Sequence, residues 1–141
     1  MKAFWENEFI HTAGYYSVVI LCMVVFLTIF EVATKYRNWE EIKKGNVAVA
    51  MATGGKIFGA INVFKYCIIA HLSPVHMIEW SVFGFGLLLL SYVMFEFLTP
   101  QFHVDEEIAK DNRAVGFIAM VISIALSFII GAGIESFASV K

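Results

Sequence analysis

Four long apolar runs joined by short polar connections constrain this chain more strongly than any other feature. Each run has about the 20 residues that a helix needs to cross the hydrocarbon of a bilayer. The connections leave no room for a soluble domain, and they make consecutive helices antiparallel neighbours. We therefore expect an all-α membrane protein with four transmembrane helices. The expected spans are residues 15–34, 47–70, 80–99 and 114–134.

The composition agrees with lipid as the solvent of these runs. Hydrophobic residues make up 60% of the 141 residues and charged residues only 16%, whereas soluble domains are about 25% charged. The net charge of −2 gives no basis for binding a nucleic acid. The first run ends in FEVATKYR without a small-residue cleavage site, so we expect a permanent span and not a signal peptide.

Lysine and arginine in the short connections predict how the helices are oriented, because these residues favour the cytoplasmic side. The first and third connections hold six of them, against three on the opposite side. The six are Lys35, Arg37, Lys43, Lys44, Lys110 and Arg113, and the three are Lys2, Lys65 and Lys141. We therefore expect connections 35–46 and 100–113 in the cytoplasm of a bacterium, both termini outside, and the inner (plasma) membrane as the location.

The polar residues recur in the same order in the two halves of the chain. The first half reads FEVAT and then EEIKKGNVAVAMA, and the second reads FEFLT and then EEIAKDNRAVGFIA. Polar residues rarely recur in one order by chance, so we expect a tandem duplication with repeats at 1–75 and 76–141. Each repeat holds two spans, so both copies enter the membrane in the same sense, and a pseudo-two-fold axis along the membrane normal should relate them.

These motifs resemble a bacterial inner-membrane family, the family of domain of unknown function 350. The run NWEEIKKGNVAVAMATGGKIFG, residues 38–59, is similar to the Bacillus-type UPF0719 transmembrane proteins. The resemblance covers nearly the whole chain. It implies four spans, tandem repeats and a plasma-membrane location, and it implies no particular activity.

Three charged residues stand out within the expected spans, away from the outer end where Lys65 lies: Glu31, Glu96 and Lys56. Such residues are costly in lipid and are candidates for function. Both glutamates lie about one helical turn inside the cytoplasmic boundary, and Lys56 lies about 15 Å along its helix from Asn46. Side chains point toward the helix N-terminus, so Lys56 can pair with Glu31 or Glu96. Alternatively, the glutamates bind connection lysines and close the bundle ends.

A stripe of small and polar residues on the second span predicts close helix packing. It contains Gly55 and Gly59 at GxxxG spacing, followed by Asn62, and such residues let backbones approach and form hydrogen bonds. The fourth span has a comparable face, which we expect to contact the small-residue face of the second span. The partner helix belongs to the same chain or to another subunit. The residues of the two faces are Asn46, Gly55, Gly59 and Asn62, and Asn112, Gly116 and Ser123.

Other polar residues have simpler interpretations. Asn46 and Asn112 stand where helix N-caps are expected. The acidic run Asp105–Glu107 with Asp111 is typical of a solvated helix start. The four histidines match no closed zinc pattern and none lies in a span, so we expect no metal and no cofactor. No catalytic motif is present, so we expect a protein that is not an enzyme.

Two function classes remain open. The first is an accessory or scaffold subunit that assembles through helix contacts, as a homo-oligomer or with another membrane protein. The second is a small proton- or cation-handling transporter or channel that uses Glu31 and Glu96. Four spans are few to enclose a pore, so either function favours a homo-oligomer within the bilayer.

Overall fold

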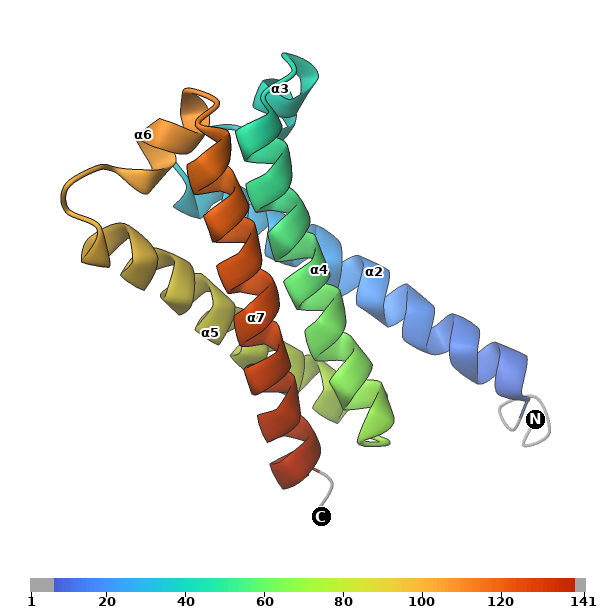
Figure 1. Ribbon diagram of the computed structural model, residues 1–141. Coiled ribbons are helices and arrows are strands. Elements are labelled where there is room, and N and C mark those ends of the chain that lie inside the picture. Colours follow the sequence, from blue (N-terminus) through green and yellow to red (C-terminus); the bar gives the residue numbers. More distant parts are fainter. Residues whose placement is uncertain (1–6, 139–141) are drawn as a thin grey trace.

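The computed structural model describes residues 7–138, which form helices joined by short connections and contain no strand (Figure 1). Lys2 and Lys141 lie outside these residues. The expectation of an all-helical chain is confirmed for the part described. The helices are α2 (Glu8–Ala33), α3 (Asn38–Lys43), α4 (Val47–Ile69), α5 (Pro74–Leu98), α6 (Val104–Ala109) and α7 (Arg113–Ala138).

Four of these helices, α2, α4, α5 and α7, are long and apolar enough to cross a membrane. They agree with the expected spans in number and order, but α2 and α5 begin several residues earlier than expected. The reason is local. The Asn7 side chain accepts from the Phe9 amide, Ser73 accepts from the His76 amide, and Pro74 occupies the first turn of α5. These caps start each helix in polar sequence, before its apolar run.

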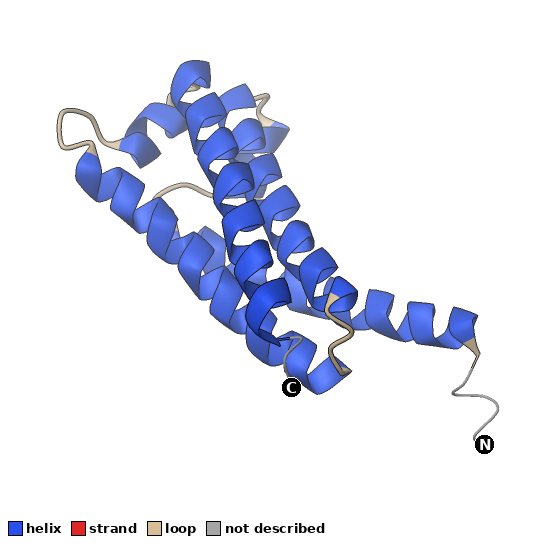
Figure 2. Ribbon diagram, turned by 60° about the horizontal axis from the view of Figure 1, so that its bottom comes forward, coloured by secondary structure: helices blue, strands red, loops and turns tan. Residues whose placement is uncertain are grey.

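The parallel pair α4 and α7 forms the centre of the fold, with α2 and α5 flanking it (Figures 1 and 2). Helices α3 and α6 lie together at one end of the bundle, which we call the α3/α6 end. The start of α2, the end of α7 and the α4–α5 turn lie at the opposite end (Figure 1). Among the four long helices, α4 has the largest buried share and α2 the smallest.

Glycine allows the two central helices to approach backbone to backbone. A Cβ atom at Gly55 would lie 2.6 Å from the Met120 Cα atom, and one at Gly116 would lie 2.6 Å from the Ala48 carbonyl oxygen. Both distances are shorter than any ordinary contact. The small-residue face of α4 therefore contacts α7 of the same chain, and it is not free to contact another subunit.

The first and third connections each contain a short helix, α3 and α6. In each, a short helix is followed by a residue with positive φ and then by an asparagine that caps the next long helix. The positive-φ residue is Gly45 in the first (φ 89°) and Asp111 in the third (φ 62°). The Val49 amide donates to Asn46 Oδ1 at 2.9 Å, and the Val115 amide donates to Asn112 Oδ1 at 3.4 Å.

The two connections also cap each other. Asn46 Nδ2 donates to the carbonyl oxygens of Ile108 and Ala109, at 3.1 and 2.9 Å, at the end of α6. In return, Asp111 Oδ1 accepts from the Ala48 amide at 2.9 Å, in the first turn of α4. Orphan carbonyl and amide groups at both helix ends are satisfied across the two halves of the chain.

Apolar side chains form two buried cores. The smaller core lies at the α3/α6 end and joins Val104 and Ile108 of α6 to Ala48, Val49 and Ala52 of α4 and to Tyr36. The larger core joins all four long helices, and its aromatic members are Phe26, Phe30, Phe64, Phe85 and Tyr92. Both cysteines, Cys22 and Cys67, are free.

We predict that Gly55→Ala destabilises the protein by about 1–3 kcal/mol, because the added methyl group overpacks the backbone contact with Met120. Gly54→Ala is the matched control, since no atom lies within 4 Å of a Cβ there. Thermal unfolding in detergent, followed by circular dichroism, measures both variants. Equal stability of the two would contradict the predicted contact.

We predict a pH dependence from the Asp111 cap, which lies outside the long apolar helices. Its pKa lies below the ordinary value of 3.8, chiefly because the carboxylate accepts from the Ala48 amide. The folded pKa is below the unfolded one, so the stabilisation is complete above pH 3.8 and is lost as the pH falls through the folded value. Between pH 6 and pH 3, wild type should lose more thermal stability than Asp111→Asn, whose amide oxygen still accepts. Parallel melting curves of the two would be evidence against the cap.

Candidate functional site

Lys56 is the most unusual residue of the buried interior. It lies on α4, about 14 Å along the helix from Val47, and it is only 2% exposed. Its Nζ atom is the one buried side-chain nitrogen or oxygen without a hydrogen-bond partner among the residues described. Buried polar groups are normally paired, so an unpartnered ammonium requires an explanation.

Three aromatic rings surround the Lys56 ammonium in place of hydrogen-bond acceptors. The Nζ atom lies 4.5 Å from the centre of the Tyr92 ring, 4.8 Å from that of Phe30 and 5.6 Å from that of Tyr36. These distances are within the range of cation–π attraction. Phe30 and Tyr92 belong to the larger core and Tyr36 to the smaller one, so Lys56 lies where the two cores meet.

Asp105 is the acidic residue whose charge acts on Lys56. It is 4% exposed, although it lies on the short helix α6. Its carboxylate accepts from the Tyr92 hydroxyl and from the Lys35 amide, the latter at 2.9 Å. The Tyr92 hydroxyl also lies 3.5 Å from that of Tyr36. Burial raises the pKa of the Tyr36 phenol, which keeps it protonated.

Glu96 connects this cluster to the surface. Its Oε2 atom accepts from the Asp105 amide at 3.1 Å. Its Oε1 atom lies 3.9 Å from Lys35 Nζ and 3.8 Å from His103 Nδ1, and both of those side chains are well exposed. Glu96 therefore pairs with residues of the connections, which was one of the two alternatives that the sequence left open.

The other alternative, a pairing of Lys56 with Glu31 or Glu96, does not occur in the structure. No ion pair joins Lys56 to either residue, because aromatic rings of α2 and α5 occupy the space around its ammonium. Glu31 is half-buried near the end of α2. The Glu40 carboxylate raises the Arg37 pKa most, through a hydrogen bond, and Glu31 adds a smaller effect of the same sign.

The acidic run is also different from the solvated patch that the sequence suggested. Asp105 is buried and Asp111 caps α4, whereas Glu106 is exposed. Sequence reasoning missed Tyr36, Tyr92 and Asp105 as members of the site. One signal was present: Tyr92 lies four residues before Glu96, so both are on one face of α5.

The remaining predicted residues lie along the contact of α4 with α7. The Asn62 amide donates to Ser127 Oγ at 3.0 Å. A Cβ atom at Gly59 would lie 3.1 Å from the Ser123 carbonyl oxygen. Together with Gly55 and Gly116, nearer the α3/α6 end, these residues form one continuous interface within the chain. The Asn112 side chain, at the start of α7, donates to Glu107 at 2.8 Å.

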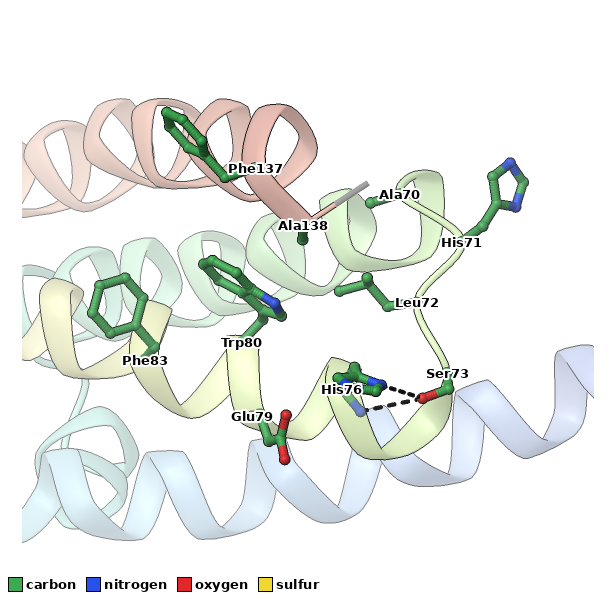
Figure 3. Close-up of a pocket in the computed structure, with 10 residues that line it drawn as sticks. All are labelled: Ala70, His71, Leu72, Ser73, His76, Glu79, Trp80, Phe83, Phe137 and Ala138. Carbon is green, nitrogen blue, oxygen red and sulfur yellow. Dashed lines mark hydrogen bonds between the residues drawn. The ribbon is translucent and has the colours of Figure 1, made fainter. Parts of the chain in front are cut away.

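A pocket of about 830 Å³ lies at the opposite end of the bundle, between α5, α7 and the α4–α5 turn. Trp80 and Phe83 of α5 and Phe137 of α7 line it, but its polar residues do not converge. His76 Nδ1 is hydrogen-bonded to Ser73 Oγ at 2.8 Å, and the side chains of His71 and Glu79 point in different directions (Figure 3). Across residues 7–138, no three side chains form a group that could hold a metal ion.

We predict that Asp105→Ala destabilises the fold, because it leaves the Tyr92 hydroxyl and the Lys35 amide without their acceptor. The expected cost is about 1–3 kcal/mol for each unsatisfied donor. Glu106→Ala, at the adjacent exposed position, should change stability by less than about 0.5 kcal/mol. Chemical denaturation in detergent measures both variants, and similar midpoints would show that Asp105 does not hold the cluster together.

Known proteins similar to this chain are membrane proteins. The model of the family described as Domain of Unknown Function (DUF350) matches residues 4–134. The UPF0719 transmembrane protein YshE of Bacillus subtilis (strain 168) is 62% identical over 134 residues, which are 95% of this chain and 100% of the relative. The UPF0719 inner membrane protein YjfL of Escherichia coli (strain K12) is 23% identical over 104 residues, 74% of this chain and 77% of the relative. No solved structure matches. The family resemblance is therefore confirmed: the chain is a transmembrane protein that belongs to the DUF350 family, with the UPF0719 proteins as its relatives.

Proposed function

We propose that this protein handles protons or small cations in the bacterial plasma membrane, with Lys56 as the central charged residue. The observation that carries the proposal is the buried Lys56 ammonium, which has three aromatic rings around it and no hydrogen-bond acceptor. Ionisable residues inside spans are expensive and mark ion or proton paths. A lysine that served only to pin helices together would be expected to have a carboxylate in contact.

The proposed exchange route leads from Lys56 to the α3/α6 end. The Tyr92 ring contacts the ammonium, and its hydroxyl donates to Asp105. Glu96 lies next to Asp105 and is partly exposed, with Lys35 and His103 beside it. Once a movement of the lysine brings its ammonium to the Tyr92 hydroxyl, Tyr92 and Asp105 would relay a proton, and Glu96 would be its exchange point with water. In this proposal Glu96 keeps the role that the sequence suggested, and Glu31 does not.

The internal repeat supports a specialised role for this cluster. We propose that the halves arose by duplication, since both connections form a short helix, a positive-φ residue and an asparagine cap. Three residues of the cluster depart from that repeat. Ile122 stands at the position that corresponds to Lys56, Leu27 at that of Tyr92 and Trp39 at that of Asp105. Phe30 and Glu96 follow the repeat, whereas the lysine, the tyrosine and the aspartate occur in one half only.

We propose that the α3/α6 end is cytoplasmic. Six lysines and arginines lie in the two connections of that end, and positive residues favour the cytoplasmic side. Glu96 would then exchange protons with the cytoplasm.

The second candidate function is an accessory or scaffold subunit, as a homo-oligomer or with another membrane protein. The sequence favoured this function through the glycine stripe of α4, but that stripe contacts α7 of the same chain. A different feature favours it: an apolar groove of about 490 Å³ between α2 and α5, at which the least buried long helix lies open to the membrane. An apolar helix of a second subunit would fit this apolar groove. Neither candidate involves catalysis.

The decisive experiment is proton and cation flux in proteoliposomes, measured with enclosed dyes under imposed gradients. We expect flux in wild type and its loss in Lys56→Met, which keeps a long side chain and removes the charge. Lys65→Met is the matched control, because Lys65 is exposed on the same helix, and its flux should equal that of wild type. Glu96→Gln should slow the flux, and Glu31→Gln should not.

Thermal unfolding must show that each variant is folded. Equal flux in wild type and in folded Lys56→Met would contradict a role for the lysine. Absence of flux in wild type under every gradient would contradict ion handling and would favour the accessory-subunit function.

A further inference from the structure

Among residues 7–138, no polar group continues the exchange route from Lys56 toward the α4–α5 turn. The next buried polar groups on α4 are Asn62, which faces α7 and donates to Ser127, and Cys67, whose sulfur lies 3.8 Å from Ser81 Oγ. Cys67 is eleven residues, about 16 Å, farther along the helix than Lys56. Ser127 in turn donates to the Ile124 carbonyl at 2.7 Å, so this pair is closed on itself.

Three phenylalanine rings fill the space between Lys56 and that end. They come from three helices, Phe26 from α2, Phe64 from α4 and Phe85 from α5. The ring centres of Phe26 and Phe85 are 4.1 Å apart, and those of Phe64 and Phe85 are 5.3 Å apart. All three rings are buried. Phe26 also contacts Phe30, at 4.8 Å between centres, and Phe30 is one of the rings around the ammonium.

Neighbouring residues close the layer around these rings. Ala60 and Val63 of α4 are fully buried. A Cβ atom at Gly84 would lie 2.8 Å from Val63 Cγ1, so only a glycine at this position of α5 lets Val63 pack so closely. Phe26 and Phe85 also form the inner wall of the apolar groove between α2 and α5. The same two rings therefore separate Lys56 both from the far end of the bundle and from the lipid-facing groove.

We propose that Phe26, Phe64 and Phe85 form an aromatic barrier that closes the Lys56 site on one side, so that in this arrangement its proton exchanges only with the α3/α6 end. The inference rests on the proposed proton-handling function and adds the residues that control access. A proton crossing the layer would have to leave every hydrogen-bonding group over a stretch lined by rings and aliphatic side chains, which is costly. Passage through the whole membrane then requires these rings to separate.

The test removes one ring of the barrier and measures whether the resulting proton entry depends on Lys56. Phe85→Ala is reconstituted in proteoliposomes, alone and combined with Lys56→Met, and proton entry is followed with an enclosed pH-sensitive dye under an imposed pH gradient. Phe97→Ala is the matched control, because Phe97 lies on the same helix and is 82% exposed. Phe85→Leu, which keeps the position apolar and nearly filled, is included in case Phe85→Ala does not fold.

We expect Phe85→Ala to raise proton entry at least about tenfold over wild type and Phe97→Ala. A modest decrease in the free-energy barrier to proton entry is enough for a tenfold increase in rate. Phe85→Leu should raise it less. Adding Lys56→Met should return entry to the wild-type level or below. Unchanged entry in folded Phe85→Ala and Phe85→Leu would overturn the barrier, as would a leak that Lys56→Met leaves intact.

The outcomes also separate this inference from the function on which it rests. If wild-type flux depends on Lys56 but the Phe85 variants do not change it, the proposed function stands and the barrier is wrong. If no variant and no wild-type sample shows a Lys56-dependent signal, the proposed function itself fails.

Discussion

The contact between the backbones of α4 and α7 is the interaction on which the rest of the fold depends. Gly55 and Gly116 remove the side chains that would keep the two helices apart, and Gly59 extends the close contact toward the middle of the bundle. In lipid, no hydrophobic effect drives helices together, so packing at short range has to do so. With this pair fixed, α2 and α5 lie on either side of it, and their rings reach Lys56 from two directions.

The position of Lys56 follows from that contact. Gly55 faces α7, and the next residue along the helix is turned by about 100°, toward α2 and α5. The lysine is therefore directed into the space where the two apolar cores meet, and not toward lipid. Asp105 reaches the same region only because α6 folds back over the end of the bundle, and hydrogen bonds from Tyr92 and Lys35 hold it there.

The sequence was sufficient for the helices and for the small-residue faces, because apolar length and the spacing of Gly55, Gly59 and Gly116 are local patterns. It was not sufficient for the site. The sequence identified Lys56 because a charged side chain within a span is energetically costly. Its neighbours depend on the path of a short connection, whose apolar pattern is too short to predict its structure. Asp105 looked like its exposed neighbour Glu106, and only the burial of Val104 and Ile108 distinguishes them. Tyr36 and Tyr92 carry no charge, so nothing in their local sequence separated them from ordinary aromatic residues.

The reciprocal caps, in which Asn46 caps α6 and Asp111 caps α4, have a consequence for biogenesis. The first turn of α4 receives the Asp111 carboxylate only after the third connection has been synthesised, although α4 itself is made much earlier. The end of α6, in contrast, receives the Asn46 amide from a segment that has already been synthesised. During translation the first hairpin therefore keeps an incomplete helix terminus until the connection between α6 and α7 arrives.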